Sequence, residues 1–220
     1  YGMVQFPLSY FSKRSGFVIN QLSGGGCEHM GNFPTFPVKG KLKMSPDNIL
    51  NYRINISEEK GHAGYYEAMV QEDIKAKLTV TERTGMASYE YPADQQYGTV
   101  IIGGGISATP IEQAAIVITA PNKCEGYAEG GNFCGLRTPY KVYFVAEFDT
   151  DALESGTWKR NELKPNTTFA EGEYSGVYFT FDVNKKKNIQ YKIGVSYVSV
   201  ENARENLKAE NTGWDFLQIQ

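Results

Sequence analysis

Apolar and polar residues alternate along much of this chain, a pattern typical of strands with one buried and one wet face. The alternation is cleanest from Ile74 to Arg83, and the strongest strand signal is Tyr140–Phe148. Two short apolar runs, Thr99–Gly103 and Ala114–Thr119, predict strands that are buried on both faces. Further strands are predicted at residues 4–6, 16–22, 52–56, 65–70, 86–91, 176–181 and 189–198, with a proline-interrupted extended or edge segment at 33–38.

Turn signals separate these runs, for example at Gln71-Glu72-Asp73. About a dozen short strands divided by turns favour an all-β sandwich over a parallel sheet built from βαβ units. One helix is predicted, at the end of the chain, where Ser199 is a suitable N-cap and Val200, Ala203 and Leu207 recur at helical spacing. Its charged residues form few favourable pairs, so we expect it to depend on docking against the sheet.

Composition agrees with a β-rich domain. The 220 residues include 15 Tyr, 12 Phe and 23 Gly, with 41% hydrophobic and 21% charged residues, which is enough for a core and argues against disorder. The net charge of −3 gives no general attraction to nucleic acid, and no apolar stretch is long enough for a membrane span.

The most unusual stretch is Gln21–Asn32, in which three glycines precede a thiol, a carboxylate, an imidazole and an amide. Glycines expose the backbone and allow positive φ, so the stretch suits a loop on which polar groups converge on a ligand. It also suits a plain connection between two strands. It lacks the Lys-Ser/Thr ending of a phosphate-binding loop.

Other chemistry is weakly indicated. Cys27 and His29 have no second ligand pair at zinc spacing and no residue that would orient the imidazole for nucleophilic catalysis. Gly126–Phe133 is read as a second loop of glycines, aromatic and polar residues, suited to a sugar or simply a long hairpin. Cys124 and Cys134 flank it and either pair or stay free. The carboxylates of the second half are interpreted as solvated surface charges: Glu125, Glu129, Glu147, Asp149, Asp151, Glu171 and Glu173.

Six stretches, in the same order along the chain, resemble the amino-terminal domain of glycoside hydrolase family 92, a family of exo-acting α-mannosidases that often cleave α-1,2 linkages. They are residues 1–5, 22–27, 64–66, 74–85, 143–148 and 195–207. The resemblance implies a galactose-mutarotase-like β-supersandwich with one C-terminal helix leading to a catalytic domain missing from this chain. It implies a sandwich domain at 1–198 and, at 199–220, a linker helix toward a helical barrel.

The resemblance also implies inverting, calcium-dependent hydrolysis in the periplasm, at the cell surface or after secretion. The calcium and the catalytic carboxylates belong to the helical domain, so the resemblance assigns no catalytic residue, metal ligand or cofactor to this chain. The chain alone is therefore expected to be inactive. Its expected partners are an α-mannoside glycan at the domain interface and the catalytic domain of the same polypeptide.

What the resemblance assigns to this chain is the glycine loop, as one wall of the pocket around the leaving-group sugar. The residues predicted to bind substrate are Ser23, Gly24, Gly26, Cys27, Glu28, His29 and Asn32. The family commonly has a His where this chain has Gln21, and it departs again at 29–32, so the linkage cleaved is left open. The alternatives are a free-standing carbohydrate-binding module and a purely structural sandwich.

Overall fold

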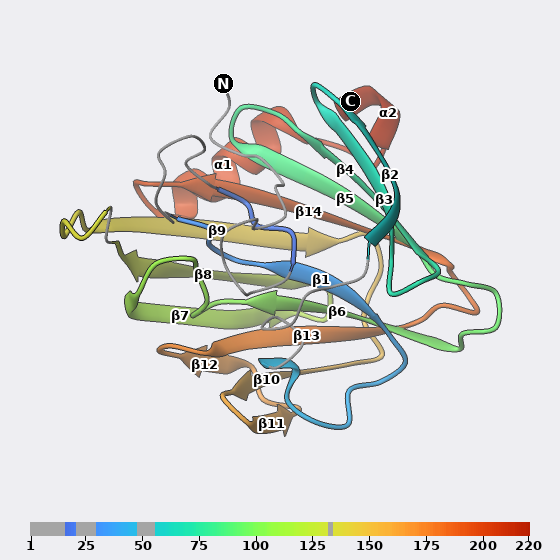
Figure 1. Ribbon diagram of the computed structural model, residues 1–220. Coiled ribbons are helices and arrows are strands. Elements are labelled where there is room, and N and C mark those ends of the chain that lie inside the picture. The colour runs from blue at the N-terminus through green and yellow to red at the C-terminus, as the bar shows by residue number, and fades with distance from the viewer. Residues whose placement is uncertain (1–15, 21–29, 48–55, 132–133) are drawn as a thin grey trace.

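The chain folds as two stacked β-sheets with a helix on the outside of the larger one (Figure 1). The computed structural model describes residues 16–20, 30–47, 56–131 and 134–220. The smaller sheet has the order β1 (Thr35–Lys39), β6 (Tyr97–Gly103), β13 (Ser175–Asp182), β10 (Glu154–Lys159) and β11 (Glu162–Pro165). The larger has the order β12 (Phe169–Glu171), β7 (Ile111–Ala120), β8 (Lys123–Gly130), β9 (Tyr140–Phe148), β14 (Asn188–Ser196), β5 (Thr84–Glu90), β4 (Ile74–Val80), β3 (Tyr65–Val70) and β2 (Ile56–His62).

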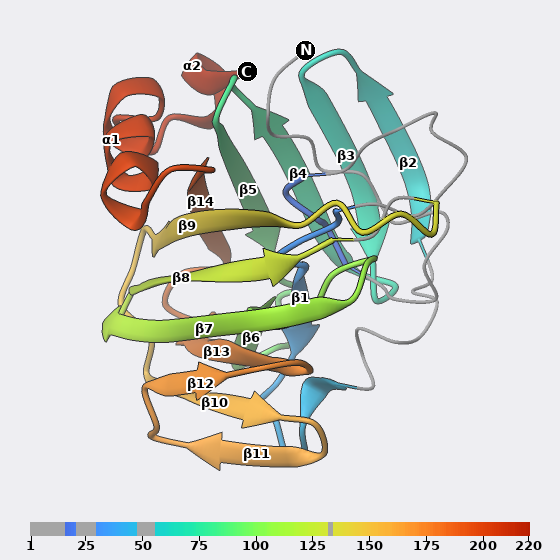
Figure 2. The ribbon, with the colours of Figure 1, turned by 90° about the vertical axis from the view of Figure 1, so that its left-hand side faces the viewer.

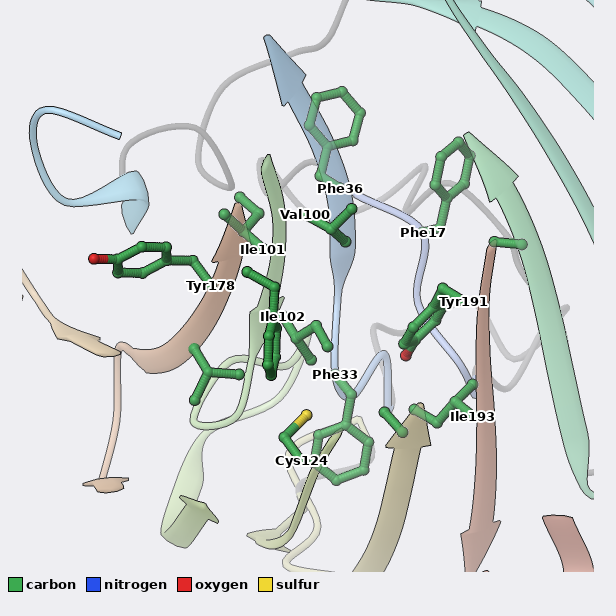
Figure 3. Packing of buried hydrophobic residues seen from close by; sticks show 14 of the residues in the cluster. Phe17, Phe33, Phe36, Val100, Ile101, Ile102, Cys124, Tyr178, Tyr191 and Ile193 are labelled. Atoms are coloured by element: carbon green, nitrogen blue, oxygen red, sulfur yellow. The ribbon is translucent and has the colours of Figure 1, made fainter. Parts of the chain in front are cut away.

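Every paired strand runs antiparallel to its neighbour. The predicted all-β sandwich is therefore confirmed. So is the edge position of the proline-containing segment, since β1 pairs with β6 on one side and, within the described residues, has only the bridge from Thr35 to Phe17 on the other. The core lies between the sheets. Figure 3 shows Phe36 and Val100 from the smaller sheet packed in one cluster with Tyr191 and Ile193 from β14.

The helix α1 (Val200–Glu210) covers the outer face of the larger sheet, beside β9 and β14 (Figure 2). Its predicted N-cap is confirmed, because the Ser199 side chain accepts a hydrogen bond from the Asn202 backbone N–H. Ala203 and Leu207 are buried against Val145 of β9, as the expected dependence on docking requires. Gly194 permits this close approach, since a Cβ there would lie 2.5 Å from the Ala203 carbonyl oxygen.

The C-terminal end of α1 is fixed to the sheet by its last residue. The Glu210 carboxylate accepts hydrogen bonds from the Thr81 hydroxyl (2.6 Å) and from the Arg83 backbone N–H (2.8 Å) and Nε (2.5 Å). Burial alone would raise the pKa of Glu210, but these hydrogen bonds outweigh it and lower the pKa. A second, four-residue helix, α2 (Phe216–Ile219), follows.

Three local predictions were wrong. The alternating run from Ile74 to Arg83 is not one strand, because β4 ends at Val80 and a turn leads into β5. The Gly126–Phe133 loop is, as far as Gly130, the strand β8, in which glycines allow tight packing on β7. The run Ala114–Thr119 belongs to the longer β7, whose residues alternate between buried and accessible instead of being buried on both faces.

Candidate functional site

The two segments that flank the glycine stretch lie side by side as an antiparallel pair. Phe17 and Thr35 exchange both backbone hydrogen bonds, at 2.9 and 2.8 Å. Nearer the stretch, the Ile19 N–H donates to the Asn32 carbonyl oxygen at 3.1 Å, and the Gly31 N–H donates to the Asn20 carbonyl oxygen at 2.7 Å. These bonds hold the two described segments, 17–20 and 31–35, against each other on either side of residues 21–29.

Two asparagines and two tyrosines hold this closure together; we call Asn20, Asn32, Tyr140 and Tyr197 the loop anchor. The Asn20 side-chain oxygen accepts from the Asn32 backbone N–H (2.8 Å), and its amide donates to the Tyr197 hydroxyl (3.2 Å). The Tyr140 hydroxyl donates to the Asn32 side-chain oxygen at 2.7 Å. Residues from β9 and from the end of β14 therefore fix the position of a segment far away in the sequence.

The two asparagines of the anchor are buried, whereas Tyr140 is partly buried and Tyr197 is 38% exposed. Asn20 and Asn32 are 1% and 0% exposed. Burial raises the pKa of Tyr140 to about 12, although hydrogen bonding to Thr109 and Asn32 partly opposes the shift. Burial also raises the pKa of Tyr197. Both hydroxyls are therefore protonated at physiological pH and serve as neutral hydrogen-bonding groups, so they are unsuited to act as bases.

A cavity of about 190 Å³ lies between the β6–β7 connection and the β12–β13 turn. It is lined by Gly105, residues 107–111, Glu173 and Tyr174. The cavity adjoins the loop anchor, because the Ala108 N–H donates to the Met30 carbonyl oxygen at 2.8 Å and the pKa of Tyr140 responds to Thr109 and Ser107. The anchor and the cavity form one continuous polar region.

Of the seven residues predicted to bind substrate, six lie outside the described residues: Ser23, Gly24, Gly26, Cys27, Glu28 and His29. The seventh, Asn32, is fully buried in the anchor. Its backbone and side chain bind Asn20 and Tyr140, and its side-chain amide has no hydrogen-bond partner within the described part of the chain. Its role as a substrate contact stays a prediction.

Three anchor residues, Asn20, Tyr140 and Tyr197, lie in segments predicted only as strands. The cavity residues Ser107 and Tyr174 were not predicted as functional either. Asparagine at a strand end is a signal for a side chain that closes a turn, and Asn20 stands directly before the glycine stretch. The tyrosines give no such signal, because their hydroxyls come within hydrogen-bonding distance of the asparagines only when the sheets have formed.

The structure shows the states of Cys124 and Cys134, which the sequence left open. Cys124 is a free thiol buried in the core, and burial raises its pKa. Cys134 is disulfide-bonded, so these two cysteines do not pair with each other.

The interpretation of the carboxylates as solvated surface charges was wrong for Asp149, whose side chain is 4% exposed and pairs with Lys186 at 2.7 Å. Glu125 is partly exposed and pairs with Arg204 of α1 at 2.6 Å. Over residues 16–20, 30–47, 56–131 and 134–220, no group of three His, Cys, Asp or Glu side chains is placed to hold a metal ion. In the same ranges no helix is long and apolar enough to cross a membrane.

Comparison with known proteins agrees with this architecture. The profile of the Glycosyl hydrolase family 92 N-terminal domain matches residues 9–196. A protein of Arthroderma benhamiae described as an uncharacterized secreted glycosidase is 23% identical over 221 residues, which cover 89% of this chain and 28% of the relative.

Two solved structures share the fold. The family GH92 glycosyl hydrolase ccman5 superposes with a TM-score of 0.84 at 20% identity, over 99% of this chain and 32% of that protein. The family GH92 α-mannosidase BT3965 from Bacteroides thetaiotaomicron superposes with a TM-score of 0.78 at 24% identity, over 93% of this chain and 29% of that protein. The chain thus spans about a third of the length of these proteins.

Proposed function

The chain belongs to the glycosyl hydrolase family 92 N-terminal domain family, and from that membership we propose that it is the sandwich domain of an exo-acting α-mannosidase. The family match over residues 9–196 carries the proposal, and the fold shared with α-mannosidase BT3965 supports it. In this proposal residues 1–198 form the sandwich domain. Residues 199–220 connect it to a helical-barrel catalytic domain in the same polypeptide.

The proposed division of labour follows from the chemistry of inversion. One carboxylic acid protonates the leaving oxygen while a second carboxylate activates water on the opposite face of the sugar ring. We place both groups, and the calcium ion, in the catalytic domain. The sandwich domain contributes neither and is inactive alone.

The contribution of this chain is one wall of the leaving-group pocket. The loop anchor supports this role, because it fixes both ends of the glycine stretch to the sheet through buried hydrogen bonds. A polar loop held at both ends loses less conformational entropy when a sugar binds. Glu28 and His29 are the proposed sugar contacts, and an α-1,2-linked mannoside is the proposed substrate.

A docking surface for the catalytic domain is proposed at the end of the larger sheet where Tyr140 and Tyr197 of the loop anchor lie. Val198 is 73% exposed where β14 leads into α1, and Leu136 is 70% exposed in the β8–β9 connection. The strand register places both beyond one end of the sheet, since Ser196 pairs with Tyr143 while Gly130 pairs with Tyr140. Docking of the catalytic domain at this end would remove both apolar side chains from water.

The test uses the full-length enzyme with Glu28→Ala and His29→Ala. Either change is expected to lower kcat/KM for α-1,2-mannobiose about tenfold or more, since a hydrogen bond to a charged partner contributes about 1.5–3 kcal/mol. Glu58→Ala, at an exposed position on the β2 edge strand, is the control and should leave kcat/KM unchanged. Unchanged values for both loop variants would instead favour a purely structural sandwich.

Calorimetric titration of the 220-residue chain separates the remaining alternative. A half-pocket should bind mannose and mannobiose too weakly to measure, whereas a free-standing carbohydrate-binding module should bind them in at least the millimolar range.

Secretion to the periplasm, the cell surface or the medium is proposed as the location, supported by the relative described as secreted.

A further inference from the structure

The cavity beside the loop anchor has rigid walls made by two interlocked backbone segments. The Gly104 and Gly105 N–H groups both donate to the Ser175 carbonyl oxygen, at 2.9 and 3.0 Å, and the Tyr174 N–H donates back to the Gly105 carbonyl oxygen at 2.8 Å. A Cβ at Gly105 would lie 1.8 Å from the Gly172 carbonyl oxygen, so only glycine allows this approach. The β12–β13 turn is thereby locked onto the β6–β7 connection, and the cavity between them is preformed.

The groups that line the cavity are those that recognise sugars. Ser107 and Thr109 bring nearly buried hydroxyls, and Glu173 brings a carboxylate that is open to solvent. Tyr174 brings a half-buried ring, and the Arg160 guanidinium lies over that ring, 4.8 Å from its centroid. A carboxylate accepts from two neighbouring sugar hydroxyls, and an aromatic ring packs against the apolar face of the sugar.

The size of the cavity also fits one sugar unit. At about 190 Å³ it is smaller than the roughly 300–1,000 Å³ of pockets for drug-sized ligands. The backbone contact from Ala108 to Met30 makes it continuous with the base of the glycine stretch.

We propose that this cavity is an additional glycan subsite, in which Glu173 and Tyr174 bind one neutral sugar residue of the oligosaccharide. The glycine loop would contact the sugar next to the cleaved bond, and the cavity would bind a sugar further along the leaving chain. This inference rests on the proposed function for its substrate. It concerns residues outside the glycine loop and a different sugar of the substrate.

The test compares Glu173→Gln with Glu171→Gln in the full-length enzyme. Glu171 is an exposed carboxylate two residues away on β12 that does not line the cavity, so it controls for the loss of one surface charge. The substrates are an aryl α-mannoside, which lacks further sugars, and α-1,2-linked mannotriose. Glu173→Gln should raise KM for mannotriose about tenfold with little change in kcat, and leave the aryl substrate unaffected. Glu171→Gln should change neither.

Two results would overturn the subsite. One is a mannotriose KM for Glu173→Gln equal to that of Glu171→Gln. The other is an equal effect of Glu173→Gln on both substrates, which would mean that the carboxylate does not act through an additional sugar.

Calorimetric titration of the same full-length proteins with mannotriose keeps this test separate from the proposed function. If the wild-type protein hydrolyses neither substrate, the proposed activity fails. Binding of mannotriose that Glu173→Gln weakens about tenfold would still support the subsite. Equal binding by both variants would refute it.

Discussion

The loop anchor predicts that one buried hydroxyl stabilises the whole base of the glycine stretch, and Tyr140→Phe isolates that hydroxyl. The substitution keeps the ring and removes only the O–H that donates to the Asn32 side-chain oxygen at 2.7 Å. Asn32 is fully buried, so its oxygen would lose its donor away from bulk water.

The expected loss follows from this burial. Leaving a buried polar group unpaired costs about 1–3 kcal/mol, and we expect about 2 kcal/mol because Asn32 is fully buried while Tyr140 is only partly buried. For a chain of this size, 1 kcal/mol lowers the Tm by about 2–4 °C, so the expected shift is about 4–8 °C. Urea unfolding of the 220-residue chain, followed by tryptophan fluorescence, measures the free energy directly.

Tyr127→Phe is the matched control. Tyr127 lies on the neighbouring strand β8, where its ring packs against Tyr143 and Lys141 and its hydroxyl has no hydrogen bond to another described residue. This variant should stay within about 0.5 kcal/mol of the wild type. If Tyr140→Phe destabilises the chain no more than the control does, the anchor contributes nothing to the closure and the reasoning fails.

Three further predictions concern the helix attachment and the cysteines. Glu210→Gln should flatten the acid limb of the stability curve. The lowered pKa of Glu210 means that its contribution is complete above the unfolded value of about 4.3 and is lost as the pH falls through the folded value, and urea titrations at pH 7 and pH 3 measure it. Gly194→Ala should destabilise the chain by about 1–3 kcal/mol, because the new Cβ meets the backbone of α1. Gly213→Ala should not, because a Cβ at Gly213 would lie 3.9 Å from its nearest neighbouring atom. Equal urea midpoints for the two variants would contradict this. Iodoacetamide should leave Cys124 unmodified in the native protein and should reach Cys134 only after reduction, and peptide mass spectrometry that finds either one alkylated without reductant would show the assignment to be wrong.

The sequence by itself determined the fold class and the family. Period-two alternation reports which face of a strand is buried, and it located β14 correctly because its apolar residues recur at every second position from Ile189 to Val195. The strands β3 and β9 were located by their aromatic and β-branched content. The helix α1 was also predicted correctly, since its N-cap and the spacing of its apolar residues are local features of the sequence. The collinear family blocks required no structure either, and the match over residues 9–196 confirmed the family that they indicated.

Local patterns failed where a contact distant in sequence decides the outcome. The glycines of Gly126–Phe133 look like those of a loop, but Gly126 is there because the Ala115 carbonyl oxygen of β7 would lie 2.1 Å from a Cβ. The break at Thr81 inside an alternating run is a turn closed by hydrogen bonds between Thr81 and Thr84, and Glu210 from the end of the chain binds it as well.

Only the tertiary structure decided how the candidate site is assembled. The glycine stretch is visible in the sequence as an accumulation of polar groups. Tyr140 lies 108 residues after Asn32 and Tyr197 lies 177 residues after Asn20, and the pairing of β9 with β14 brings each tyrosine to its asparagine. The cavity likewise needs the β12–β13 turn to lie on the β6–β7 connection. Residue types and spacing therefore determined the layers and the family, whereas sheet pairing determined which distant side chains surround the loop.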